Sequence, residues 1–338
     1  IGMVDKCREA LKAAGIESDA FTQTEGNPST DTVAKAAEGF KSSKADFIVA
    51  FGGGSPLDVA KAVAVIASYG GNITDYEGGG KVPGPVVPMI AIPTTAGTGS
   101  EVTAFSVITD HSRNYKLTVV SNYLLPAYAI LDPELITTVP KSTAAACGID
   151  AMVHALEAFI SKAASPFSDL FAKEALRLIG TSIRDYVLDR SNLAACEAML
   201  TGSLFAGIAF SHARLGDVHA MSHPVSAYFD IAHGVANAVL LPTIVDYNMT
   251  YASEKYKYIY DCICEKPLDD DSFTPEMLAA EIRVLNDELG IPSSLSEVGV
   301  DSSLFDKMAD DAMKSGNILV NPRPTTKKDI LALYAQAF

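Results

Sequence analysis

Apolar positions recur with two different periods in the first 139 residues of the chain. Met3 to Ala14 and Thr30 to Lys41 repeat them at the spacing of one helix face, whereas Asp46 to Phe51 and Val87 to Ile92 are short, mostly apolar runs of strand length. Helices that alternate with buried strands are typical of a parallel sheet covered by helices. The pattern therefore predicts an α/β domain over residues 1–139.

Further strands are expected in the same domain. A short strand is expected near Glu17 to Phe21, while Ala104 to Thr109 and Tyr115 to Val120 have the pattern of two strands joined by a polar turn. The chain begins with the helix Met3 to Ala14, although an open α/β sheet ordinarily starts with a strand. We therefore expect an amino-terminal piece to precede residue 1.

From Pro140 to Phe338 the apolar positions follow the helical period almost throughout. Turn residues interrupt this pattern, for example at Gly216, Asn248 and Gly290. The change of period predicts a domain boundary near Val139–Pro140, so residues 140–338 are expected to form an all-helical domain. A ligand site is expected in a cleft between the two domains, which is a usual position for such sites.

Composition narrows the classes of partner and compartment. The 338 residues are 48% hydrophobic and carry a formal net charge of −15, with no lysine- or arginine-rich stretch. Nucleic acid and anionic membranes are disfavoured as partners, because binding to either needs basic patches. The amino end has no signal-peptide pattern, the apolar runs are broken short of a membrane span, and the five cysteines are scattered. These features together favour the cytoplasm.

A strand-to-helix turn is predicted in the stretch Gly52-Gly53-Gly54-Ser55-Pro56-Leu57-Asp58. Ser55 suits the N-cap of the helix, Pro56 its first position and Asp58 its third. Glycines ahead of a helix start let backbone N–H groups approach an anion, and the helix dipole favours a phosphate there. The stretch therefore predicts a pyrophosphate site, with a tight turn that binds no ligand as the alternative.

A second glycine-rich loop is expected after the strand Val87 to Ile92, over residues 93–102 with the sequence Pro-Thr-Thr-Ala-Gly-Thr-Gly-Ser-Glu-Val. Its hydroxyl and amide donors suit phosphate and ribose oxygens. Lys116 lies close to these loops if the strands 104–109 and 115–120 fold back. Two such loops at strand ends predict a nucleotide-binding site.

Histidines are concentrated in the second half of the chain. Four of the six are His212, His219, His223 and His233. Earlier, Asp150 and His154 stand four residues apart on one face of a predicted helix. One carboxylate with three imidazoles suits a divalent ion of borderline hardness, iron(II) or zinc. Spacing alone leaves the alternatives open: Asp150 and His154 belong to a metal site, form a surface pair, or include a hydrogen-bonded core histidine.

Together these motifs resemble the iron-containing, or group III, alcohol dehydrogenases. The similar segments are, in order, residues 52–58, 93–102, 148–157, 218–224 and 233–242, so the resemblance spans essentially the whole chain. The branch indicated is that of lactaldehyde reductase and 1,3-propanediol dehydrogenase. The resemblance implies a dehydroquinate synthase-like fold, in which a Rossmann-like domain with a parallel sheet precedes an all-helical domain that carries the metal.

Roles follow from the resemblance residue by residue. The implied metal ligands are Asp150, His154, His219 and His233. His223 corresponds to a catalytic histidine beside the substrate, and His212 matches no ligand. The implied cofactor-binding residues are Asn27, Gly53, Gly54, Ser55, Asp58, Thr94, Thr95, Thr98, Val107 and Lys116. Asp217 and Thr243 depart from the family pattern and are expected to alter the polarity of the pocket.

The resemblance implies an alcohol dehydrogenase that moves hydride between a nicotinamide nucleotide and a small primary alcohol or diol. Iron(II) is the expected metal, with zinc as the alternative. NAD is the expected cofactor, with NADP as the alternative, since the selecting residue would precede residue 1. A homo-oligomer is expected. Glycerol dehydrogenase or another member of the superfamily is the alternative enzyme, and a non-catalytic nucleotide or metal sensor is the alternative class.

Overall fold

The computed structural model describes residues 2–266 and 268–338, and its chain divides into two compact units. The first unit contains Ile1–Thr94 and Thr103–Ile130, and the second contains Thr95–Val102 and Leu131–Phe338. The loop 95–102, which lies inside the first predicted domain, is thus grouped with the second unit. The domain boundary expected near Val139–Pro140 stays a prediction.

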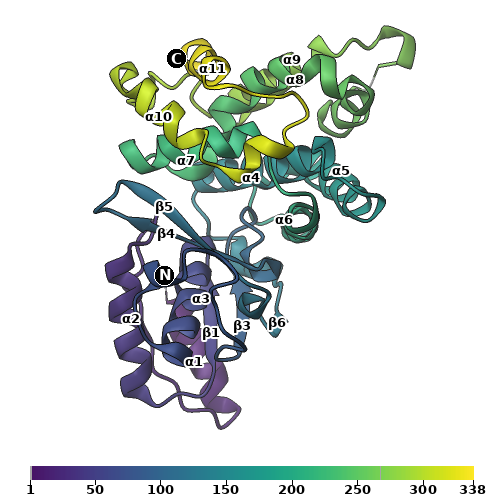
Figure 1. The fold of residues 1–338 in the computed structure, drawn as a ribbon. Helices are drawn as coiled ribbons and strands as arrows, with labels where there is room; N and C mark the ends of the chain where they lie inside the picture. Colours follow the sequence, from purple (N-terminus) through teal and green to yellow (C-terminus); the bar gives the residue numbers. More distant parts are fainter. Residues whose placement is uncertain (1, 267) are drawn as a thin grey trace. The chain divides into compact units, whose positions relative to one another are not determined.

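A parallel sheet forms the centre of the first unit (Figure 1). Its strand order is β1 (Ile48–Gly52), β3 (Met89–Pro93) and β6 (Tyr128–Ala129). β1 and β3 are parallel with Ile48 opposite Met89, and helix α3 (Gly54–Tyr69) follows β1 directly and packs against both strands. Strand β3 alternates buried and half-buried residues, as a strand does when one face contacts the core. The parallel sheet that the sequence predicts is confirmed.

A second sheet in this unit contains an antiparallel pair. Strand β4 (Phe105–Asp110) pairs antiparallel with β5 (Tyr115–Val120), and β5 pairs in parallel with the short β2 (Gly78–Gly79). Helix α2 (Thr30–Ser43) begins where Ser29 accepts a hydrogen bond from the backbone N–H of Thr32. Buried residues of α2, α3, β4 and β5 form one apolar core, so the predicted strand pair packs against these two helices.

One predicted strand is wrong. Residues 16–25, which include the expected strand Glu17 to Phe21, contain no helix or strand in the structure. A strand requires a neighbour that completes its backbone hydrogen bonds, and no described strand pairs with these residues. The preceding helix α1 (Met3–Ala13) forms as predicted, although none of its residues is buried.

The second unit is helical, as predicted, but the interruption expected at Asn248 is wrong, because one helix continues from His233 to Ile263 through that position. Its longer helices are α4 (Lys141–Ile160), α5 (Pro166–Leu188), α6 (Leu193–Ala213), α7 (Asp217–Phe229), α8 (His233–Ile263), α9 (Glu276–Leu289), α10 (Phe305–Ala312) and α11 (Lys327–Ala337). Helix α4 packs against α5, α6 and α8 and is buried almost continuously from Ala144 to Ile160. Its many alanines favour the helix and let neighbouring helices approach closely.

Two helices of this unit are longer and more apolar than the sequence pattern indicated. By length and composition alone, α4 and α6 could each cross a membrane. In α4, however, 89% of the apolar window is buried inside the unit, as expected of a core helix.

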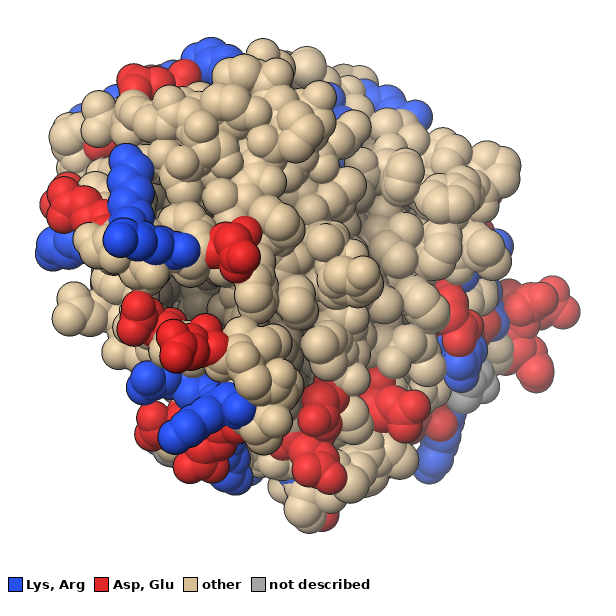
Figure 2. Space-filling view, turned by 90° about the horizontal axis from the view of Figure 1, so that it is seen from below, with Lys and Arg blue, Asp and Glu red and all other residues tan. Residues whose placement is uncertain are grey.

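On the face drawn in Figure 2, lysines and arginines are interspersed with acidic residues rather than gathered in one basic patch.

Candidate metal centre and phosphate-binding loops

Helix α4 presents three polar side chains on one face inside the helical unit. Asp150, His154 and Glu157 are separated by four and three residues, which places them one above another along the helix. All three are buried, with at most 5% of each residue exposed. Polar groups this deep in a core need partners, because their desolvation is costly.

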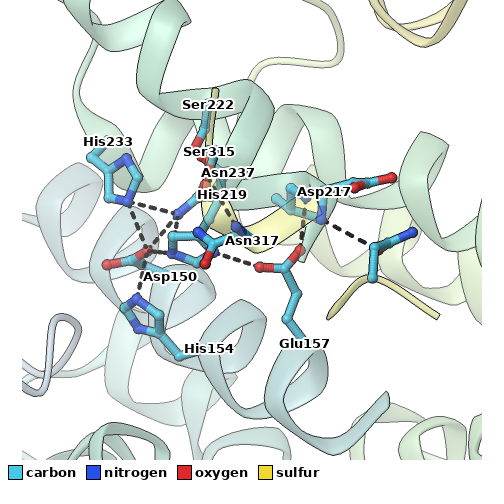
Figure 3. A network of polar contacts seen from close by, with 12 residues as sticks. Asp150, His154, Glu157, Asp217, His219, Ser222, His233, Asn237, Ser315 and Asn317 are labelled. Atoms are coloured by element: carbon cyan, nitrogen blue, oxygen red, sulfur yellow. Dashed lines mark hydrogen bonds and ion pairs between the residues drawn. The ribbon is translucent and has the colours of Figure 1, made fainter. Parts of the chain in front are cut away.

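Two more histidines approach Asp150 from other helices (Figure 3). His219 lies in the first turn of α7, and His233 is the first residue of α8. The Nε2 atoms of His154, His219 and His233 lie 3.9, 3.8 and 3.9 Å from Oδ1 of Asp150. Among the described residues, the ligand atoms of Asp150, His219 and His233 are also within 4.8 Å of one another.

This arrangement fits a divalent metal ion. A tetrahedral ion with bonds of about 2.1 Å holds its ligand atoms about 3.4 Å apart, so the observed separations need to close only slightly. The Nδ2 atom of Asn237 lies 2.6 Å from Asp150 Oδ1, 3.3 Å from His219 Nε2 and 3.2 Å from His233 Nε2. The amide nitrogen of Asn237 therefore faces the carboxylate oxygen of Asp150 and the Nε2 atoms of two histidines at once, so these three atoms surround one small space. One carboxylate oxygen and three imidazole nitrogens suit iron(II) or zinc.

Two of these histidines also have a hydrogen-bond acceptor at Nδ1, the ring nitrogen that does not face Asp150. His219 Nδ1 lies 2.6 Å from Oε2 of Glu157, and His154 Nδ1 lies 3.2 Å from the backbone carbonyl oxygen of Gly97. Burial lowers the pKa of His219 well below its ordinary value, and the charge of a protonated His154 would lower it further. His219 is therefore neutral, with its Nδ1 facing Glu157 and its Nε2 facing Asp150.

A further buried carboxyl group close to Glu157 is that of Asp217. Asp217 is fully buried, and its carboxylate accepts a hydrogen bond of 2.6 Å from Thr325. Burial raises the pKa of Asp217 to about 7 and that of Glu157 to about 7 as well, although backbone N–H groups oppose the rise at Glu157. In Figure 3 the Asp217 carboxylate points away from Asp150 and the histidines, so the expected effect on pocket polarity is not direct.

The other two histidines of the cluster differ in their surroundings. His223 is half-buried, one helical turn after His219, with its ring centroid 5.2 Å from that of His233 and 6.1 Å from that of His219. His233 is the most exposed of the four candidate ligands, with 25% of its side chain exposed, and the ring of His223 lies beside it. His212 is exposed at the end of α6 and contacts the ring of Phe167.

The triglycine turn has the predicted position but different capping. Helix α3 begins at Gly54 with Gly53 as its N-cap, and no side chain caps it, so the expectation that Ser55 is the N-cap and Pro56 the first residue is wrong. The helix thus begins two residues earlier than expected, and Pro56 is tolerated as its third residue because N–H groups of the first turn have no partner within the helix. Gly52 has a φ of +152°, and a Cβ there would lie 2.6 Å from Pro56 Cγ. The first N–H groups of α3 consequently remain available to an anion.

Several residues expected at the cofactor also hold the first unit together. Asp58 accepts a hydrogen bond of 3.0 Å from the backbone N–H of Val107, which ties α3 to β4. Lys116 Nζ lies 2.8 Å from Asn27 Oδ1, so these two predicted residues meet although 89 positions separate them. The backbone N–H of Thr94 donates to the carbonyl oxygen of Gly52, 2.9 Å away.

The loop 95–102 packs within the helical unit. A Cβ at Gly97 would lie 2.8 Å from Cβ of Cys147 on α4, and one at Gly99 would lie 2.7 Å from Cα of Gly207 on α6. Its glycines thus permit close contact with two helices, a packing role that the local sequence does not reveal. Thr95 and Thr98, both predicted at the cofactor, lie in this loop and so belong to the second unit.

Comparison with known proteins identifies the family. The model described as iron-containing alcohol dehydrogenase matches residues 1–133, and the one described as Fe-containing alcohol dehydrogenase family, C-terminal, matches residues 144–338. The chain belongs to the iron-containing alcohol dehydrogenase family. The resemblance inferred from the sequence motifs is therefore confirmed.

Relatives of this iron-containing alcohol dehydrogenase are similar over its whole length. A 1,3-propanediol dehydrogenase of Klebsiella pneumoniae is 40% identical over 338 residues, covering 100% of this chain and 87% of the relative. The NAD-dependent methanol dehydrogenase of Bacillus methanolicus is 34% identical, covering 99% of this chain and 88% of the relative. A crystal structure of a 1,3-propanediol oxidoreductase superposes with a TM-score of 0.94 at 40% identity, covering 100% of this chain and 89% of that one.

Two residues of the candidate centre were missed in the sequence analysis. Glu157 stands seven positions after Asp150 on the same helical face, and Asn237 stands four positions after His233. Both spacings can be read from the sequence. They do not show, however, that Glu157 and Asn237 contact the histidines of the centre instead of the metal ion.

Proposed function

We propose that this iron-containing alcohol dehydrogenase interconverts small primary alcohols or diols and their aldehydes by hydride transfer, using a nicotinamide nucleotide and a divalent metal ion. The observation that carries the proposal is the convergence of three imidazole Nε2 atoms within 3.9 Å of Asp150 Oδ1 in a member of this family. The names of the relatives that act on 1,3-propanediol and methanol support a small alcohol as the substrate.

The proposed metal ligands are Asp150, His154, His219 and His233. Iron(II) is the first choice and zinc the second, since a mixed oxygen and nitrogen set accepts both. When bound, the ion supplies a Lewis acid that lowers the pKa of an alcohol or polarises an aldehyde carbonyl. The chain contributes imidazoles whose Nε2 atoms converge on Asp150 Oδ1, and three of the four proposed ligands are almost fully buried.

His223 is proposed as the catalytic residue on the substrate side. Its ring lies next to that of His233, the most exposed of the four ligands, so a substrate that approaches from that side meets both. A neutral imidazole at this place would hydrogen-bond the substrate hydroxyl or accept its proton.

The nucleotide is proposed to be NAD, with NADP as the alternative. The uncapped start of α3 after Gly53 offers backbone N–H groups and a helix dipole to a pyrophosphate. The proposed cofactor-binding residues are Asn27, Gly53, Gly54, Ser55, Asp58, Thr94, Thr95, Thr98, Val107 and Lys116. The name of the NAD-dependent methanol dehydrogenase supports NAD as the first choice.

We also propose that the enzyme acts as a homo-oligomer in the cytoplasm. Exposed apolar side chains lie at or beside the edge strand β6, where Tyr128 is 69% and Ile130 49% exposed, and such edges are usually covered. All five cysteines are free, in keeping with a reducing compartment. Light scattering that gives the mass of a single chain at working concentration would contradict the oligomer.

The experiment that tests the function combines turnover with metal analysis. Purified protein is stripped of metal with a chelator, reloaded with iron(II) without oxygen or with zinc, and supplied with NADH and propanal while NADH oxidation is followed. We expect turnover that depends on about one equivalent of metal for each chain. Turnover that survives complete metal removal, or its absence in metal-loaded protein with small aldehydes and alcohols, would refute the proposal.

A further inference from the structure

The carboxylate of Glu157 holds the start of helix α7 at two adjacent residues. Its Oε2 is 2.6 Å from Nδ1 of His219, and its Oε1 accepts a 2.7 Å hydrogen bond from the backbone N–H of Val218. Glu157 lies on α4, so one side chain connects the helix of Asp150 and His154 to the helix of His219 (Figure 3). Gly216 makes room for it, because a Cβ at that position would lie 2.9 Å from Oε1.

This contact determines which nitrogen of His219 carries the proton. The Asn237 amide nitrogen, which can only donate, lies 3.3 Å from His219 Nε2, so Nε2 carries the lone pair and the nitrogen that faces the Glu157 carboxylate is Nδ1–H. The neutral ring then has its lone pair on Nε2, which is the atom 3.8 Å from Asp150 Oδ1. We infer that Glu157 is a positioning residue of the metal centre, which fixes the tautomer and ring orientation of His219 so that Nε2 is ready to bind the ion. This inference rests on the ligand set of the proposed function.

The two buried histidines are not held equally. His154 faces the neutral carbonyl oxygen of Gly97 at 3.2 Å, whereas His219 faces a carboxylate at 2.6 Å. Hydrogen bonds to an ionised partner are shorter and about twice as strong as neutral ones. Groups that orient a metal-binding histidine typically change metal affinity about 10- to 100-fold when they are replaced. Glu157 is therefore the residue whose loss should affect the centre most without removing a ligand.

The variant Glu157→Gln separates positioning from packing, because it preserves the size of the side chain. Its amide has one acceptor and one donor group, whereas Val218 N–H and His219 Nδ1–H both require an acceptor. If the amide oxygen faces Val218, the NH₂ group meets His219 and favours the tautomer with its proton on Nε2, which cannot bind metal. If it faces His219, the backbone N–H is left unsatisfied. The matched control is Asp217→Asn, the same change at a buried carboxyl that bonds Thr325.

Cobalt(II) alone is the probe. Metal-free wild type, Glu157→Gln and Asp217→Asn are titrated with cobalt(II), whose visible absorption reports affinity and coordination geometry, and circular dichroism checks folding. Nitrogen-15 spectra of the histidines in metal-free protein report the tautomer of His219. We expect Glu157→Gln to bind cobalt(II) about 10- to 100-fold more weakly with an altered absorption spectrum, and Asp217→Asn to bind as the wild type does.

Several results would overturn the inference. Glu157→Gln that binds cobalt(II) with wild-type affinity and spectrum would show that the carboxylate does not position His219. Equal weakening in both variants would mean that the amide substitutions merely loosen α7. A wild-type His219 with its proton on Nε2 would refute the inference without any variant, even if Glu157→Gln failed to fold. Wild type that binds no cobalt(II) would instead refute the proposed ligand set, and the inference with it.

Discussion

The buried carboxyl group of Asp217 predicts a pH dependence of stability in the metal-free enzyme. Its pKa in the folded protein is raised to about 7, first by burial and further by the charge of Glu157, although the hydrogen bond from Thr325 opposes the rise. The ordinary value of 3.8 applies to the unfolded chain. Between these two values the folded state retains a proton that the unfolded state has released.

The sign and size of the effect follow from this difference. Because the folded state binds more protons, the free energy of unfolding falls as the pH rises above about 4 and levels off above about 7. Each pH unit well inside this window costs about 1.4 kcal/mol, and the slope falls to half at pH 7, so the range from pH 5 to pH 7 corresponds to a loss of about 2 kcal/mol. Asp217 is fully buried, so screening by solvent does not reduce this figure.

Urea denaturation of wild type and Asp217→Asn, both free of metal, measures this contribution at several values from pH 5 to pH 8. Asparagine does not titrate, so the difference between the two proteins measures the contribution of Asp217 together with its interaction with Glu157. We expect the stability of Asp217→Asn relative to wild type to increase by about 2 kcal/mol between pH 5 and pH 7. Parallel stability curves for the two proteins would refute the reasoning.

Three further predictions concern the centre and the loops. His219→Ala should lose metal and activity together, whereas His223→Ala should retain its metal by elemental analysis and lose rate or shift its pH profile; the reverse pattern would exchange their roles. Gly53→Val should weaken nucleotide binding in a fluorescence titration while metal content stays unchanged, because a β-branched side chain obstructs approach to the start of α3; unaltered affinity would mean that the turn binds no phosphate. Gly99→Ala should lower the free energy of unfolding by about 1 to 3 kcal/mol, measured by urea denaturation. The added Cβ would lie 2.7 Å from Gly207 Cα, and the φ of Gly99 is +62°. An unchanged midpoint of urea unfolding would contradict this packing.

Features with a short sequence range were predictable from the residues alone. The helical period of 141–160 places Asp150 and His154 on one face whatever surrounds the helix, because a helix is set by local geometry. The antiparallel pair β4 and β5 has a polar turn between two apolar strands, and it forms as predicted. The family motifs are likewise contiguous, which is why membership in the iron-containing alcohol dehydrogenases could be inferred before the fold.

Tertiary structure alone decided the contacts between distant residues. The contact of Glu157 with His219 spans 62 positions, and that of Asn237 with Asp150 spans 87. No local sequence pattern predicts a contact between residues so far apart in the chain. The strand expected near Glu17 is absent for the same reason, since a strand depends on a neighbour that the local sequence does not specify. Local propensity selects helices and turns, but the partners of a buried polar group depend on how the helices pack, and that packing determines which imidazole nitrogen faces the metal centre.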